Sequence, residues 1–315
     1  MSTNMSTKRA ATGATGTTGA PKRRKTIPIF STTHCINRVP EFVWQKEIIS
    51  YLDLMQFSKM RCHSSFNKYW HEEIAKNIIR VPQGCPTVEK AMRIAMIFLN
   101  NARSPLKIVL DKGNHKIMGN AMTLNVTCSH ITFIGKGKNQ TTIRGGFKVF
   151  NQQDVKFEEV SITNPARMCM GLHLRGSETN VDVLKCIVKE CRLSGMYVDD
   201  GATVTAEQCE FMENGGNGVS CHNSNTKVRL NDCQMHHNGG SGLQSYDHAV
   251  VDLHGTKTDI HSNKQCGICA SSRGKVNIHL PSQHNTSHDN VGEDRNEQWG
   301  GSIANINADG TFTHT

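Results

Sequence analysis

The chain has 315 residues, and its hydrophobic content of 37% is low for a protein built around one large globular core. Its formal net charge of +9 is concentrated near the N-terminus: residues 1–27 contain six Lys and Arg residues and no acid, which leaves +3 for the rest. A nearly neutral body argues against a broad nucleic-acid interface. The sequence contains no run of about 18 apolar residues, so no membrane-spanning helix is predicted.

Residues 1–27 are predicted to form a disordered basic tail, because Thr, Ala, Gly and Ser dominate residues 1–20. The cluster PKRRK at residues 21–25 is typical of a nuclear-import signal, although a solvated run of charges has the same composition. Any nucleic-acid binding is expected in this tail alone. The N-terminus lacks the apolar segment of a secretory signal, so we expect the protein in the cytoplasm or nucleus.

Residues 38–80 are predicted to form short helices, because apolar residues recur with a helical period between residues 40 and 70. This segment resembles an F-box: a Pro-Glu pair is followed by Ile-Ile-Ser-Tyr-Leu-Asp-Leu, then Phe-Ser-Lys-Met-Arg-Cys, then a Trp eight residues after the cysteine. The resemblance implies docking onto the Skp-type adaptor of a cullin-type ubiquitin ligase, with Leu52, Leu54 and Phe57 as apolar anchors. The alternative is that these helices only cap the repeats that follow.

Residues 81–106 are predicted to form a linker and a capping helix. The sequence VEKAMRIA places five apolar residues on or near one face: Val88, Ala91, Met92, Ile94 and Ala95. We expect this helix to cover the first coil of the repeat region, whose open edge would otherwise pair with another chain.

Residues 107–315 contain a repeat of 23–25 residues whose leading glycines are Gly171, Gly195, Gly218, Gly242 and Gly267. Segments such as GLHL and GMYV are short and alternate in polarity, which indicates strands. Such units bury their apolar sides only by stacking. The expected buried stacks are Leu172, Met196, Val219, Leu243 and Ile268; Val160, Cys186, Cys209 and Cys233; and, at a corner, Asn214, Asn238 and Asn263.

This pattern resembles the right-handed parallel β-helix of the pectate-lyase type, so the predicted fold is a mainly β solenoid preceded by a small helical segment. A β-sandwich also has many short strands, but equal units with asparagine and cysteine ladders are not typical of it. The ladder cysteines are expected to be reduced, because free cysteine packs well as a small apolar side chain. We predict no cofactor and no metal site, including at the CGIC sequence of residues 266–269.

Strand alternation directs two further ladders outward: His173, Tyr197, Ser220, Gln244 and Cys269, and Arg175, Asp199, His222, Tyr246 and Ser271. We expect a binding surface for a protein or glycan here, formed by His173, Tyr197, Gln244, Arg175, His222 and Tyr246. The alternative is an ordinary solvated sheet face.

An enzyme hypothesis starts from the sequence YVDDGA, because polygalacturonase-type β-helices carry an Asp-Asp pair on this face as acid and base. The candidate catalytic residues are then Asp199, Asp200, Asp247, His222 and Arg175. The family's Gly-His-Gly block is matched only by Ser-Cys-His, its Arg-Ile-Lys block is absent, and Asp-Asp-Gly is also a common turn. We therefore favour a protein-recognition module, possibly a substrate-recruiting F-box subunit, over a polysaccharide-active enzyme resembling pectate lyase or polygalacturonase.

Overall fold

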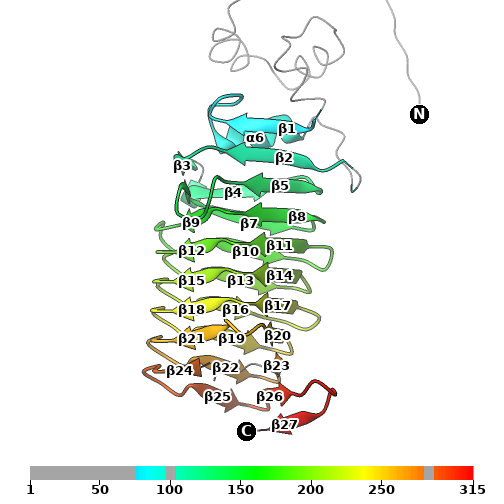
Figure 1. The fold of residues 1–315 in the computed structure, drawn as a ribbon, viewed down its shortest axis with the longest axis vertical. Helices are drawn as coiled ribbons and strands as arrows, with labels where there is room; N and C mark the ends of the chain where they lie inside the picture. The colour runs from blue at the N-terminus through cyan, green and yellow to red at the C-terminus, as the bar shows by residue number, and fades with distance from the viewer. Residues whose placement is uncertain (1–75, 97–101, 103, 119, 280–286, 315) are drawn as a thin grey trace, which may run out of the picture.

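A computed structural model describes residues 76–96, 102, 104–118, 120–279 and 287–314. The predicted tail and the F-box-like segment up to residue 75 lie outside the described residues. The described chain winds into a solenoid whose coils stack along its long axis, from α6 (Val88–Ala95) at one end to β27 (Phe312–His314) at the other (Figure 1).

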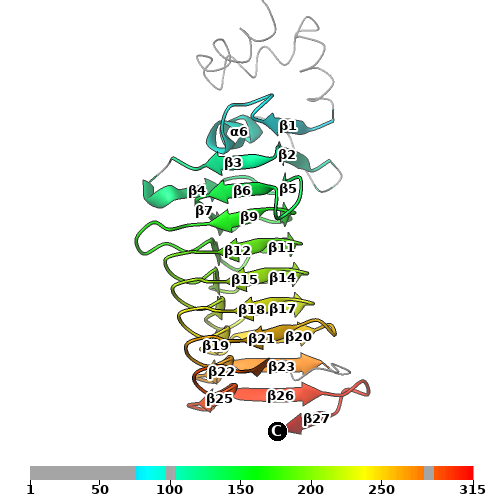
Figure 2. The ribbon, with the colours of Figure 1, turned by 60° about the vertical axis from the view of Figure 1, so that its left-hand side comes forward.

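Successive coils each add one strand to three sheets, and Figure 2 shows two of these sheets side by side. Sheet 1 has eight strands: β4 (Thr123–Val126), β7 (Gly146–Phe150), β10 (Leu172–Arg175), β13 (Met196–Asp199), β16 (Val219–Cys221), β19 (Leu243–Tyr246), β22 (Ile268–Ser271) and β25 (Arg295–Gln298). Sheet 3 has eight strands: β3 (Gly113–Lys116), β6 (Thr141–Arg144), β9 (Ser161–Thr163), β12 (Ile187–Lys189), β15 (Glu210–Met212), β18 (Gln234–His236), β21 (Asp259–His261) and β24 (Ser287–His288).

A short 3₁₀ helix, η2 (Asn120–Met122), precedes β4 of sheet 1. Sheet 2 is the longest of the three sheets. Its eleven strands are β1 (Ile78–Val81), β2 (Leu106–Leu110), β5 (Ile131–Ile134), β8 (Val155–Glu158), β11 (Asn180–Leu184), β14 (Thr203–Glu207), β17 (Lys227–Asn231), β20 (Val250–His254), β23 (Lys275–His279), β26 (Ser302–Ile306) and β27. Neighbouring strands are parallel except β26 and β27. The repeat therefore produces the parallel solenoid that the sequence predicts.

The predicted buried stacks are confirmed. The first pairs in register through sheet 1 with every member buried: Leu172, Met196, Val219, Leu243 and Ile268. The second stack is buried between sheets 2 and 3 and consists of Val160, Cys186, Cys209 and Cys233. Its three cysteines are free thiols. Burial raises the pKa of the Cys186 thiol well above its usual value. These cysteines are apolar packing groups.

The predicted asparagine ladder is confirmed at the corner between sheets 3 and 1. The Asn214 side-chain amide donates to Oδ1 of Asn238 at 3.0 Å, Asn238 donates to Asn263 at 2.9 Å, and Asn263 donates to Asn290 at 2.9 Å. Asn238 and Asn263 are fully buried. The ladder satisfies polar groups that would be costly to bury unpaired.

The capping helix is confirmed as α6, and all five predicted apolar residues are buried. The Thr87 hydroxyl accepts a hydrogen bond from the Lys90 backbone N–H at 3.2 Å and so caps the first turn. The predicted start of the solenoid at residue 107 is wrong, because Ile78–Val81 already pairs with β2 as the first strand of sheet 2. This strand belongs to an incomplete coil that lacks the leading glycine of the later coils, so the repeat pattern does not predict it.

Within the described residues, α6 is the one α-helix, and no helix is long and apolar enough to cross a membrane.

Candidate functional site

The outer face of sheet 1 carries the first predicted ladder in register: His173 pairs with Tyr197, Tyr197 with Ser220, and Ser220 with Gln244. In the second ladder Arg175 pairs with Asp199, whereas His222 follows β16 and its N–H donates to the Val198 carbonyl at 2.9 Å.

The ladders differ from the prediction in exposure. Ser220, Asp199 and Ser271 project from the outer side of the strands, yet their exposed fractions are only 2%, 8% and 2%. Ser220 is covered because side chains of its own coil and the next contact its hydroxyl. Alternation predicts which way a side chain points but not what lies over it.

Four rings form a row across sheet 1. The Tyr197 ring lies 5.4 Å from the His173 ring, edge to face, and stacks on the His222 ring at 4.8 Å. The His222 ring lies 5.3 Å from that of Tyr246 on its other side. His222 is thus held between two tyrosines, which fixes the plane of its imidazole.

Burial sets the protonation of the central ring pair. It lowers the pKa of His222 below its usual value of 6.5, although Asp199 and Asp247 act in the opposite direction. Burial also raises the pKa of Tyr197, assisted by Asp199 and then Asp200. At neutral pH the pair is therefore an uncharged imidazole beside an uncharged phenol.

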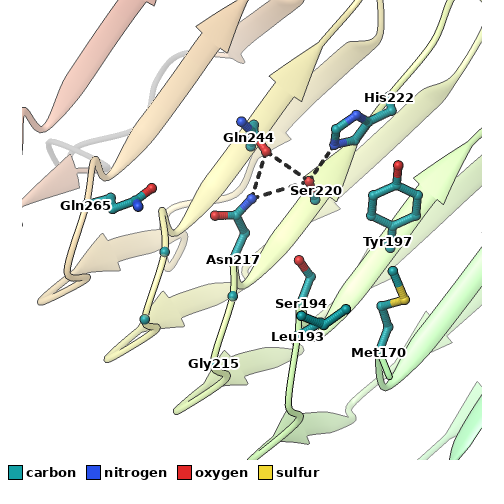
Figure 3. Close-up of a pocket in the computed structure, with 13 residues that line it drawn as sticks. Met170, Leu193, Ser194, Tyr197, Gly215, Asn217, Ser220, His222, Gln244 and Gln265 are labelled. Atoms are coloured by element: carbon teal, nitrogen blue, oxygen red, sulfur yellow. Dashed lines mark hydrogen bonds between the residues drawn. The ribbon is translucent and has the colours of Figure 1, made fainter. Parts of the chain in front are cut away.

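A hollow of about 390 Å³ opens beside this ring pair (Figure 3). Its walls are Tyr197 and His222 on one side and the glycine-rich turns of two successive coils on the other. Thirteen residues line it: Met170, Leu193, Ser194, Tyr197, Gly215, Gly216, Asn217, Ser220, His222, Gly239, Gly240, Gln244 and Gln265. None of these thirteen described residues is Asp, Glu, Lys or Arg.

A hydrogen-bond network lies in the hollow. The Ser220 hydroxyl is 2.8 Å from His222 Nε2 and 3.1 Å from Gln244 Oε1. The Asn217 side-chain amide donates to Gln244 Oε1 at 2.8 Å and is 3.3 Å from Ser220 Oγ. The Ser241 backbone N–H donates to Asn217 Oδ1 at 2.8 Å, which fixes the direction of the amide. The side chains of the network in Figure 3 therefore hold one another in place.

Sequence reasoning missed Asn217 and the glycines of the hollow. A Cβ at Gly239 would collide with the Gly215 carbonyl, so the turns of neighbouring coils approach too closely for a side chain. The available signal is a break in the repeat, because NGGNG at 214–218 becomes NGGSG at 238–242 and only the first carries Asn217.

An ionic cluster lies beside the row of rings. Arg175 Nε is 2.6 Å from Asp200 and 3.8 Å from Asp199, and the Asn223 amide donates to Asp200 at 2.6 Å. Hydrogen bonds from Arg175 and then Asn223 lower the pKa of Asp200 below its usual value. His173 Nε2 and Asp199 Oδ1 are 3.6 Å apart and make no hydrogen bond to any described residue. Asp200 is thus held as an ionised partner of Arg175, which does not suit a general acid.

The backbone explains the Asp-Asp-Gly sequence as a turn. Asp200 and Gly201 both have positive φ, 53° and 84°, so they redirect the chain from sheet 1 to sheet 2 as predicted. Asp247 occupies a similar turn two coils on and does not line the hollow. Of the candidate catalytic residues, the structure brings Arg175, Asp199 and Asp200 together and places His222 alone in the hollow.

A family model described as "Right handed beta helix region" matches residues 113–290, which is more than half of the chain. The chain belongs to the right-handed β-helix family. No match to a curated protein was found.

Solved structures similar to this β-helix are distant. The A-module of the mannuronan C-5 epimerase AlgE4 from Azotobacter vinelandii is 13% identical, with a TM-score of 0.47 over 67% of this chain and 71% of that chain. ORF18 of Geobacillus virus E2 is 13% identical, with a TM-score of 0.45 over 75% and 62%. The pectin methylesterase PemA from Erwinia chrysanthemi is 11% identical, with a TM-score of 0.46 over 75% and 84%. Likeness at this level says nothing about what the β-helix binds.

Two predictions concern other parts of the β-helix chain. The adaptor-docking anchors Leu52, Leu54 and Phe57 lie outside the described residues, so docking stays a prediction. Within the described residues, no group of three His, Cys, Asp or Glu side chains is arranged to hold a metal ion.

Proposed function

We propose that this β-helix is a carbohydrate-recognition protein and that the hollow on sheet 1 is its binding site. The observation that carries the proposal is the lining itself: aromatic rings, amides and a hydroxyl converge on one hollow that has no formally charged side chain. Pockets for small polar ligands combine an apolar wall with a few fixed polar groups in this way.

The two sides of the hollow fit the two kinds of surface on a sugar. The Tyr197 ring lines the hollow with apolar ring carbons for the C–H groups of a pyranose, and its hydroxyl offers a polar tip. Asn217 and Gln244 offer amides to the sugar hydroxyls from two successive coils. Since Ser241 already orients Asn217, a ligand need not order that side chain.

The charges favour a neutral sugar over a uronic acid. The hollow has no Lys or Arg to pair with a uronate carboxylate. Asp199 and Asp247 both act electrostatically on His222 in the hollow, and the neighbouring Arg175 is already paired with Asp200. A polygalacturonate chain would meet like charge here, so the substrate class of the enzyme hypothesis fits poorly.

A glycan array that carries neutral and uronic-acid sugars tests the proposal with the full chain. We expect neutral glycans to bind, and Tyr197→Ala to weaken the selected glycan by at least about tenfold, or about 1.4 kcal/mol. The matched control is Arg229→Ala on the exposed face of sheet 2, which should bind as the wild type does. Binding of uronates alone, or equal binding by Tyr197→Ala, would contradict the proposal.

The competing hypothesis from the sequence is recognition of a protein, with the F-box-like segment docking on the Skp-type adaptor. It predicts an empty glycan array and a protein partner whose binding depends on Tyr197 and Gln244. Adaptor docking itself is compatible with either ligand, because it concerns residues 40–70 and not the hollow.

A further inference from the structure

We infer that Ser220 is a nucleophile activated by His222, and that the hollow removes O-acyl groups from the carbohydrate it binds. The inference rests on the proposed function for the identity of its substrate. It goes beyond recognition because it assigns a reaction to two residues of the hollow.

The first observation is the distance between nucleophile and base. Ser220 Oγ lies 2.8 Å from His222 Nε2, closer than its other acceptor, Gln244 Oε1, at 3.1 Å. A serine hydroxyl becomes nucleophilic when a neutral imidazole within hydrogen-bond reach takes its proton. The pair is the kind of contact that acyl transfer requires.

The second observation is that the base is held in place. The His222 ring stacks on Tyr197 at 4.8 Å and lies tilted against Tyr246 at 5.3 Å, so its Nε2 keeps its direction toward Ser220. Asp199 and Asp247 both act electrostatically on His222. Their negative charge would stabilise the imidazolium that forms when the proton is transferred.

The third observation is a fixed donor beside the nucleophile. The Asn217 amide nitrogen lies 3.3 Å from Ser220 Oγ, and the Ser241 N–H holds the other end of that amide. A side-chain amide in this position can donate to the oxyanion of a tetrahedral intermediate. Ser220 lines the hollow with an exposed fraction of only 2%, so Gln244 must move aside for an ester carbonyl to reach its hydroxyl from within the hollow.

The reaction uses an O-acyl ester and water. Ser220 Oγ attacks the ester carbonyl carbon while its proton passes to His222 Nε2. The bond to the sugar oxygen then breaks, that oxygen takes the proton from His222, and the acyl group remains on Ser220. Water attacks the acyl-serine and gives a proton to His222, and collapse returns a proton to Ser220 and releases the carboxylic acid.

A fluorophosphonate probe tests the nucleophile directly, since it phosphonylates activated serines without any sugar. We expect one label per full-length chain, located on Ser220 by mass spectrometry. His222→Phe keeps a ring between the two tyrosines but removes the base, and should slow labelling by about 10²–10⁴-fold. Acetate release from O-acetylated neutral glycans should fall by a similar factor.

The matched control is Ser262→Ala, because Ser262 also contacts an imidazole, at 3.0 Å from His261 Nδ1, but lies outside the hollow. It should be labelled as fast as the wild type. Ser220→Ala should not be labelled; if it fails to fold, the site of the label on wild-type protein decides the question.

No label on Ser220, or an equal labelling rate in His222→Phe, would overturn the inference. Glycan binding without labelling would remove the nucleophile and leave recognition standing. Labelling of Ser220 with an empty glycan array would support the nucleophile and contradict carbohydrate recognition.

Discussion

Two amide networks join the same successive coils of this β-helix, and only one of them repeats. At the corner between sheets 3 and 1, Asn214, Asn238 and Asn263 repeat the same side chain in the same bond, coil after coil. In the hollow, Asn217 bonds to Gln244, a different residue at a different place in its repeat. The corner is periodic, whereas the hollow is built once.

The difference separates structure from function. A periodic ladder does the same job in every coil, which is to satisfy buried polar groups while the sheets stack. The bond between Asn217 and Gln244 appears once, so the stacking of the other coils does not require it. We therefore interpret the break in the repeat around Asn217 as the mark of the functional site.

The largest expected effect comes from breaking the ladder. Asn238→Ala removes the acceptor of the Asn214 N–H and the donor to the Phe211 carbonyl, both buried, so we expect a loss of about 3–5 kcal/mol in the free energy of unfolding. Urea unfolding measures this loss.

The matched change in the hollow is Asn217→Ala. It removes the acceptor of the Ser241 N–H, but Asn217 is only partly buried and water can replace part of its hydrogen bonding, so the loss of stability should be smaller, about 1–2 kcal/mol. It should nevertheless weaken ligand binding. Equal destabilisation by the two changes would contradict the distinction between ladder and hollow.

The same distinction explains what the sequence could predict. Repetition itself reveals the buried stacks, the asparagine ladder and the outward rows, because each residue is supported by its equivalents one repeat away. Asn217 and the covering of Ser220 have no such equivalents, since they depend on how one turn lies over one strand. The first strand, Ile78–Val81, was missed for a related reason: its coil is incomplete.

A third region, residues 40–70, offers the next largest effect. If it docks on the adaptor, the double variant Leu52→Ala, Leu54→Ala should weaken adaptor binding by about 2–4 kcal/mol, since anchors carry most of an interface's energy. The melting temperature of the solenoid should stay unchanged. Pull-down and a thermal melt measure the two quantities. A lower melting temperature, with no adaptor binding by the wild type, would instead indicate a cap.

The cysteine ladder sharpens the contrast between apolar and polar stacking. Cys209→Ser places a hydroxyl in a buried apolar row and should cost about 1–3 kcal/mol, whereas Cys209→Ala or Cys209→Val should cost less. Thermal melts of the three variants rank them.

Thiol titration without denaturant should find Cys186, Cys209 and Cys233 unreactive, and rapid reaction of these thiols would contradict their burial.

The smallest expected effect is the contribution of His222 to the pH dependence of the free energy of unfolding. The folded-state pKa of His222 is lowered from 6.5, so between the folded value and 6.5 the unfolded chain binds more protons. Stability should therefore fall as the pH drops below 6.5, by at most about 1.4 kcal/mol per pH unit from this group. Unfolding of the wild type and His222→Phe at several pH values isolates the contribution. A constant difference between the two proteins would mean that His222 has an ordinary pKa.

The most direct test of the hollow as the binding site is a histidine NMR titration. The full chain with isotope-labelled histidines is titrated with the best array glycan, and the His222 signal is assigned by its absence in His222→Phe. We predict that His222 shifts in a saturable manner while His236 on sheet 3 and His254 on sheet 2 stay in place. Saturable shifts of His236 or His254 with His222 unmoved would place the ligand elsewhere and contradict the account.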